Sequence, residues 1–325
     1  MSTNVSSNET EAVGPDWSSI YQMIFYICMG SVVTSNNLAI LYIVVRTAKF
    51  RLFGFLALGD MCFGLAFLTA GPIRILYLLE GSYTDLIDTH RCLLAPWWHF
   101  FLGGFLWPTI ATMFITLERL IALCVPAWYR TNWTAATEVR LIYVAALTVV
   151  LAALPGVVLT WQSKLAPLTP RHCALSRTVG SAYTVFYTGV GAFGGLITVV
   201  CNIFVRLLAK RQFASLKLPE NDNFIVRQKR INRSVGAIVL ASLIFVVLPN
   251  FCILASDVGL ANFNLVIRRY FVLSFALNSM INFYLYFALN SEFRQCILKY
   301  IFQRKVGSVH PSGNAPTHFV MQRSR

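Results

Sequence analysis

The chain has 325 residues, of which 57% are hydrophobic and 12% are charged, and its formal net charge is +14. Soluble domains have roughly 45–50% apolar and about 25% charged residues, so this composition needs lipid to cover part of the surface. The basic residues stand in short gaps between apolar runs and form no patch interleaved with aromatics. Loops beside anionic lipid therefore explain the charge better than a nucleic-acid partner does.

The N-terminal segment, residues 1–19, is polar and carries Glu9, Glu11 and Asp16. It lacks the basic start and short apolar core of a cleavable signal peptide, so we expect the first apolar run to direct membrane insertion. The segment also carries two glycosylation sequons, at Asn4 and Asn8. Both would be used if this tail lies outside the cell.

Seven apolar windows follow, each long enough to cross the bilayer as a helix. A crossing takes about 20 mostly apolar residues, because a backbone amide left unbonded in lipid costs several kcal/mol. The sequence therefore predicts an all-α membrane protein with a seven-transmembrane bundle over residues 20–289. The predicted spans are 20–45, 52–79, 93–125, 139–161, 179–208, 234–257 and 266–289.

The distribution of basic residues predicts the orientation of the spans. Of the 27 Lys and Arg residues, 20 fall on the side that holds the C-terminus. Because basic loops stay in the cytosol during insertion, we expect the C-terminus inside and the N-terminus outside. Cys92 and Cys173 are then both external, where disulfides persist, and we expect a bridge between them.

Polar residues inside the spans are costly and each is a functional hypothesis. Asp60 in the second span is the clearest, with Asn37, Asn278 and Asn282 as expected partners near the middle of the membrane. Such a cluster could hold a hydrated monovalent cation or a proton and bias helix packing. A hydrogen-bonded structural clamp is the equal alternative.

Several short motifs resemble those of rhodopsin-like G-protein-coupled receptors. Glu118-Arg119 is similar to the acidic-Arg motif that ends their third helix, and Leu56-Ala57-Leu58-Gly59-Asp60 resembles their second-helix motif. Asn37 resembles the first-helix signature, and Asn282-Phe283-Tyr284-Leu285-Tyr286 resembles the seventh-helix motif. Residues 290–302, opening with Ser291-Glu292-Phe293-Arg294, look like the amphipathic helix that lies on the inner leaflet, followed by a cytoplasmic tail at 303–325.

The resemblance implies a receptor of the plasma membrane that activates a heterotrimeric G protein. Glu118 would restrain Arg119 at rest, and release of Arg119 would accompany activation, with Asn282 and Tyr286 completing the switch. Some positions depart from the pattern, since Phe283 replaces a proline and Val247 a tryptophan. This erosion resembles nematode serpentine chemoreceptors, and it implies a chemosensory small molecule or a peptide as the extracellular ligand.

The same resemblance places a ligand pocket among spans three, five, six and seven. The third span has no aspartate in its outer half, which argues against a biogenic amine, and the seventh has no lysine for retinal. Arg74, Arg268 and Arg269 could attract an anionic ligand or a peptide C-terminus, or could be solvated loop charges. The expected pocket residues are Trp98, Phe101, Phe105, Tyr183, Tyr187, Asn250 and Phe251.

Other features are less specific. Cys296, among basic residues beside the membrane, is a palmitoylation candidate or a plain interfacial cysteine. The basic loop at 209–233 could contact a G protein or anionic lipid head groups. We find no metal-ligand spacing and no nucleophile paired with a base, so we expect neither an enzyme nor a cofactor. A seven-helix transporter or a ligand-gated channel subunit is the main alternative to a receptor.

Overall fold

The computed structural model describes residues 17–47, 51–162, 168–215, 237, 239–261, 263, 265–289 and 291–302. The sequons at Asn4 and Asn8, the tail from residue 303 and most of the basic loop lie outside these residues. The side chains of Arg268 and Arg269 are also outside the description.

Seven helices are long and apolar enough to cross a membrane, and together they form the predicted all-α bundle of a multi-pass membrane protein. The observed bounds lie within a few residues of most predicted windows, although the fifth span continues to residue 215. The spans are α1 (Trp17–Thr47), α2 (Arg51–Leu79), α3 (Pro96–Cys124), α5 (Ala135–Gln162), α7 (Ser181–Ser215), the sixth span (Val239–Asp257) and α10 (Leu265–Leu289).

Prolines set both ends of α3. Pro96 stands in its first turn, where a missing N–H costs no hydrogen bond. At the other end Pro126 disfavours helical geometry at the residue before it, and Val125 has φ −133° and ψ 62°. The helix therefore stops at Cys124, and a separate short helix, α4 (Pro126–Asn132), turns away from it.

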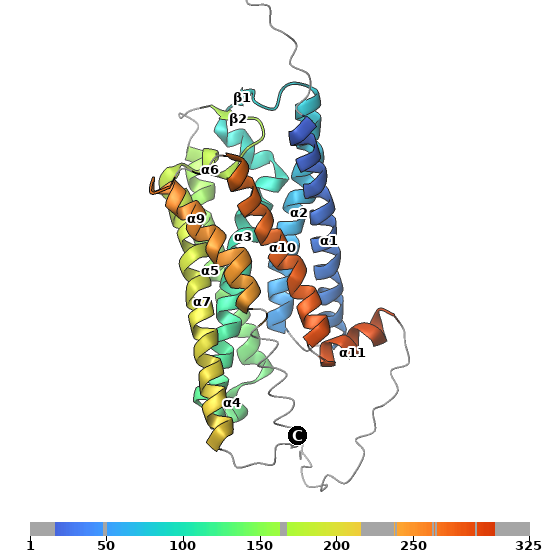
Figure 1. Cartoon of the computed structure of the whole chain (residues 1–325), viewed down its shortest axis with the longest axis vertical. Coiled ribbons are helices and arrows are strands. Elements are labelled where there is room, and N and C mark those ends of the chain that lie inside the picture. Colours follow the sequence, from blue (N-terminus) through green and yellow to red (C-terminus); the bar gives the residue numbers. More distant parts are fainter. Residues whose placement is uncertain are drawn as a thin grey trace, which may run out of the picture.

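The bundle has two distinct ends (Figure 1). One end, called here the disulfide end, carries β1 (Leu86–Ile87), the 3₁₀ turn η1 (Thr89–Leu94), β2 (Thr169–Pro170) and α6 (Leu175–Thr178). The strands pair antiparallel, with Leu86 opposite Pro170. The other end, called the α11 end, carries α4 and α11 (Ser291–Tyr300).

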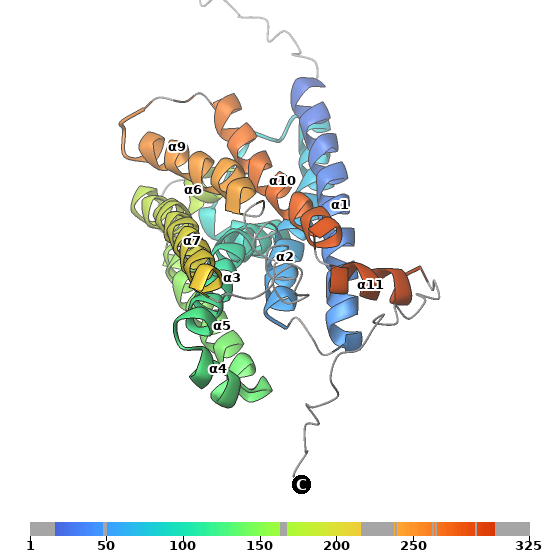
Figure 2. The same cartoon turned by 60° about the horizontal axis from the view of Figure 1, so that its bottom comes forward.

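Helix α3 packs against α2, α5 and α7, while α1 packs against α2 and α10 (Figure 2). The approach of α3 to α2 depends on a glycine, since a Cβ at Gly104 would lie 2.6 Å from the backbone nitrogen of Phe63. Small residues at such contacts let helix backbones approach closely in a membrane.

Helix α11 follows the last span almost at once and extends past α1 to the side of the bundle (Figure 2). Phe293 and Ile297, one turn apart, are buried on its inner face in a cluster with Ile40, Ile43 and Ala57. Arg294 and Lys299 lie on the same short helix, which makes it amphipathic. The helix predicted after the seventh span is therefore confirmed.

The sixth span is irregular in the middle. A π-helical segment, η3 (Leu243–Val247), precedes α9 (Leu248–Asp257), and Pro249 lies in the first turn of α9. The backbone N–H of Leu248 bonds to the carbonyl of Leu243, five residues earlier. Proline has no N–H to donate to the carbonyl four residues before it, so the regular ladder breaks here.

Candidate functional site

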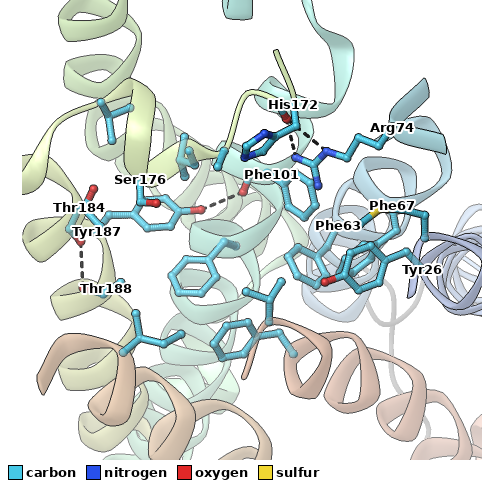
Figure 3. A pocket seen from close by; sticks show the side chains of 18 of the residues that line it. Tyr26, Phe63, Phe67, Arg74, Phe101, His172, Ser176, Thr184, Tyr187 and Thr188 are labelled. Atoms are coloured by element: carbon cyan, nitrogen blue, oxygen red, sulfur yellow. Dashed lines mark hydrogen bonds between the residues drawn. The ribbon is translucent and has the colours of Figure 1, made fainter. Parts of the chain in front are cut away.

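A cavity of about 260 Å³ opens within the bundle toward the disulfide end. Its wall comes from α1, α2, α3, α6, α7, α9 and α10 and from the segment after β2, so the expectation of spans three, five, six and seven was too narrow. Aromatic rings dominate the lining (Figure 3), namely Tyr26, Phe63, Phe67, Tyr83, Phe101, Phe105, Tyr187 and Phe275. Several of these rings meet edge to face, as aromatic pairs prefer.

The segment around β2 covers this cavity and is fixed at three points. A disulfide joins Cys92 to Cys173, which confirms the predicted bridge. Cys173 has φ +49°, a left-handed turn that is uncommon for a residue other than glycine. Just before this turn, the rings of His172 and Tyr83 stack with centroids 4.6 Å apart. The backbone carbonyl of His172 accepts two hydrogen bonds from the guanidinium of Arg74.

Three of the seven expected pocket residues line the cavity. Phe101 and Phe105 project from α3, and Tyr187 projects from α7. The rings of Phe105 and Tyr187 stack with centroids 4.5 Å apart, and the Tyr187 hydroxyl donates a 2.8 Å hydrogen bond to the carbonyl of Phe101. These three side chains therefore form the wall between α3 and α7.

The other four expected pocket residues do not line the cavity, because each side chain packs against a neighbouring helix. Trp98 is buried, and its indole N–H donates to the hydroxyl of Thr178 at 2.8 Å. Tyr183 points to α5, where its hydroxyl donates to the carbonyl of Ala152 at 2.8 Å. A polar tip on a buried aromatic ring seeks such a partner.

The remaining two belong to the sixth span. Asn250 is fully buried, and its amide nitrogen donates to the carbonyl of Val246 at 2.9 Å. Its side chain packs against Gly191 of α7, which has no side chain at this contact. Asn250 therefore lies between α9 and α7 and not in the cavity. Phe251 meets Phe193 edge to face at 5.5 Å.

Residues on the first two spans were missed as cavity residues. Tyr26 lies on α1, and Phe63 and Phe67 lie one turn apart on α2, all facing the cavity (Figure 3). Both helices are apolar around most of their circumference, so periodicity does not reveal which face turns inward. The spacing of two phenylalanines at i and i+4 beside Asp60 was the available signal.

Between the two ends, Asp60 is 1% exposed and lies in a polar cluster where, among the described contacts, one of its three expected partners bonds to it. The hydroxyl of Ser279 donates to its Oδ1 at 2.6 Å, and Asn282 is a second side-chain partner. Asn37 donates instead to the carbonyl of Val33 in its own helix, and Asn278 is buried nearby on α10. Ser279, which the sequence reasoning did not single out, is thus the closest partner.

The expected restraint of Arg119 by Glu118 is absent, since no ion pair joins them among the described residues. Adjacent residues on a helix do not face each other. Glu118 accepts a 2.6 Å hydrogen bond from the hydroxyl of Tyr129 in α4 instead. Burial raises the pKa of Tyr129 above its usual value, and the hydrogen bond to Glu118 raises it further.

Arg119 turns toward the bundle, and its Cζ lies 5.8 Å from the centre of the Phe53 ring. Tyr286 meets the same ring edge to face at 4.9 Å. All three line a second cavity, of about 40 Å³, together with Asn202, whose amide donates to the hydroxyl of Thr116 at 2.8 Å. The predicted switch residues Arg119 and Tyr286 therefore meet around Phe53, whereas Asn282 lies at the Asp60 cluster.

Cys296 on α11 is partly buried against the cluster formed by α1, α2 and α11.

Several helices line both cavities. Helices α2, α3, α7 and α10 and the sixth span contribute residues to both cavities, one toward the disulfide end and one toward the α11 end. No protein-family model and no curated protein sequence matches this chain.

Proposed function

We propose that the protein is a G-protein-coupled receptor of the rhodopsin-like kind, in which an extracellular ligand fills the larger cavity and the α11 end activates a heterotrimeric G protein. One observation carries the proposal: two cavities toward opposite ends of the bundle have five lining spans in common, and the smaller cavity contains Arg119. A ligand at one end can then shift the populations of two arrangements at the other.

The irregular sixth span supports this coupling. Ile253 lines the larger cavity, and Val239 and Ser242 line the smaller one. The π-helical segment and Pro249 lie between them along the chain, where the hydrogen-bond ladder is already interrupted. A break of this kind is where a helix bends at low cost.

The proposal places the protein in the plasma membrane with the disulfide end outside the cell. The Cys92–Cys173 bridge supports this side, because disulfides persist in oxidising compartments. The basic residues of the α11 end, including Arg46, Arg294 and Lys299, suit a cytosolic face beside anionic lipids. Enzymatic deglycosylation should increase the mobility of the protein on a gel, and the double variant Asn4→Gln/Asn8→Gln should show no such change. That result would support this topology.

The experiment is G-protein activation in cells, measured for wild type and Arg119→Ala at matched surface expression against a library of small acidic, volatile and peptide ligands. Arg91→Ala is the control, because Arg91 is an exposed arginine at the disulfide end. We expect a ligand-evoked or basal signal that Arg119→Ala abolishes and Arg91→Ala retains. Ligand-evoked current or uptake that survives Arg119→Ala would replace the receptor with a channel or transporter.

A further inference from the structure

We propose that the larger cavity binds a small aromatic molecule, about one benzene ring with a short substituent in size, and selects it by ring-to-ring contacts over a saturated ring of the same shape. The inference deepens the proposed function and rests on it in taking this cavity as the ligand site. It starts from the rings that line the cavity.

Five of these rings come from four helices, and several meet edge to face. Phe63 of α2 meets Phe101 of α3 with centroids 5.9 Å apart and planes at 79°. Phe105, one turn further along α3, meets Phe275 of α10 at 5.0 Å and 81°. The other neighbour of Phe105 is Tyr187 of α7, whose ring stacks on it at 4.5 Å. Rings in these orientations line the cavity on its α2, α3, α7 and α10 sides (Figure 3).

Phe101 and Phe105 keep free surface although they stand inside the bundle. Each packs against two hydrophobic clusters, one that includes residues of α3, α5 and α7 and one that includes residues of α1, α2 and α10. A ring between two clusters would be fully buried in a solid core, because protein interiors have few voids. Both rings are only partly buried, so their free surface faces the cavity that they line.

Selection of an aromatic ring has a basis distinct from hydrophobicity. The face of an aromatic ring carries partial negative charge and its edge partial positive charge, so edge-to-face and offset contacts stabilise a pair beyond the area that it buries. A saturated ring of the same shape buries similar apolar area and lacks this charge distribution. An aromatic ligand can therefore extend the edge-to-face pattern of the wall, and a saturated one cannot.

The hydroxyl groups on the α7 side are already engaged by the protein. The hydroxyl of Tyr187 donates to the carbonyl of Phe101 at 2.8 Å, and that of Thr184 donates to a carbonyl of its own helix at 2.8 Å. The hydroxyl of Thr188 lies 2.8 Å from the carbonyl of Thr184 and 3.3 Å from a carboxylate oxygen of Asp257. A ligand that needed these hydrogens would first have to break existing bonds, so this side favours a ligand that accepts few hydrogen bonds.

The volume limits the size of the ligand. The cavity measures about 260 Å³. An apolar cavity of about 150 Å³ is enough to bind benzene, so the present one holds a benzene ring and a substituent of a few heavy atoms. This size favours the small molecule over the peptide among the ligands that the sequence suggested.

The test compares aromatic ethers with saturated ethers of the same shape. The full chain is purified in lipid nanodiscs, and its thermal unfolding is followed with anisole and ethoxybenzene and with methoxycyclohexane and ethoxycyclohexane. The free concentration of each ether is measured in the aqueous phase, and affinity follows from the dependence of Tm on that concentration. We expect wild type to bind each aromatic ether about fivefold more tightly than its saturated counterpart, as one added ring contact predicts.

Two variants place the selectivity in the cavity. Phe105→Leu keeps an apolar side chain and removes the ring that contacts Tyr187 and Phe275. We expect it to lower the preference for aromatic ethers at least twofold, while the saturated ethers still bind and so show that the variant is folded. Phe251→Leu is the matched control, because it removes an edge-to-face contact with Phe193 outside the cavity, and it should keep the wild-type preference.

A preference below twofold in wild type would overturn the inference, as would a preference that Phe105→Leu leaves unchanged or a series in which no ether raises Tm. The wild-type comparison does not depend on any variant folding. No G protein is present, so the two proposals fail separately. Aromatic-selective binding without G-protein activation in cells would sink the receptor, whereas Arg119-dependent activation by a ligand that has no aromatic ring would sink the aromatic site.

Discussion

The hydroxyl of Tyr129 donates a 2.6 Å hydrogen bond to Oε1 of Glu118, and this contact ties α4 to the end of α3. Pro126 follows the end of α3 and turns the chain so that Tyr129, eleven residues after Glu118, faces Glu118. Trp133 stacks on the Tyr129 ring with centroids 5.0 Å apart, which holds it in place. Glu118 is therefore engaged by a neutral donor, and Arg119 is left to face Phe53 and Tyr286.

Tyr129→Phe tests this arrangement, since it keeps the ring and removes the hydroxyl. We expect the free energy of unfolding to fall by about 1 kcal/mol, because a partly buried carboxylate loses a donor. The change also releases α4 from the end of α3 at the α11 end, where we propose that the G protein binds, so G-protein activation should fall. Thermal unfolding and the cellular assay measure the two effects. Tyr143→Phe, at an exposed tyrosine of α5, is the control and should alter neither.

The same contact predicts a dependence on pH. Burial, followed by the hydrogen bond to Glu118, raises the pKa of Tyr129, so its folded-state pKa lies above the unfolded value of about 10. Its stabilising contribution is complete below pH 10 and is lost as pH rises further. The Tm difference between wild type and Tyr129→Phe should therefore stay constant from pH 7 to about 10 and shrink above it. A difference that grows with alkaline pH contradicts the assignment.

Two adjacent glycines of α3 should respond in opposite ways to the same change. A Cβ at Gly104 would lie 2.6 Å from the nitrogen and 2.7 Å from the Cα of Phe63, and backbone atoms cannot move aside. Gly104→Ala should therefore cost about 3 kcal/mol or more and reduce surface expression. Gly103 meets nothing within 4 Å, so Gly103→Ala should be neutral or stabilising by up to about 1 kcal/mol. Equal effects would mean that α2 and α3 do not pack as described.

The sequence predicted the seven spans, the helix after them and the Cys92–Cys173 bridge, because span length and cysteine position follow from general constraints. It did not predict which helix faces line the cavity. Lipid is as apolar as a helix interface, so a hydrophobic span gives little contrast between its inner and outer faces. The family resemblance implied a pair of Glu118 with Arg119, whereas the observed partner of Glu118, Tyr129, depends on a turn after Pro126 whose direction the sequence does not reveal.

A double-mutant cycle tests the Asp60 cluster. Ser279→Ala removes the 2.6 Å donor to a side chain that is 1% exposed, and we expect a loss of about 1–3 kcal/mol. In an Asp60→Asn background the same change should cost less, because an amide is less costly to bury than a carboxylate. Thermal or chemical unfolding of the four proteins gives the coupling. Strictly additive effects would show that the two side chains do not interact.

The last prediction concerns the break in the sixth span. Pro249 cannot donate to the carbonyl of Phe245, and the hydroxyl of Ser274 on α10 donates to that carbonyl at 2.9 Å. The same oxygen also lies 2.6 Å from the carbonyl of Phe271, so its single hydrogen is shared between its own helix and the sixth span. A hydroxyl shared in this way favours the present position of the sixth span without fixing it rigidly.

Ser274→Ala removes that tie while changing little volume. A hydrogen bond is worth about 1 kcal/mol, so an equilibrium between two positions of the sixth span should shift by about fivefold, and basal G-protein activation should rise by a similar factor. Ser31→Ala is the matched control, because its hydroxyl bonds only to Ile27 within α1 among the contacts described. A basal signal that stays at the wild-type level in Ser274→Ala, at equal surface expression, would mean that the tie does not restrain the sixth span. A rise that Arg119→Ala then abolishes would connect the break at Pro249 with the smaller cavity through one helix.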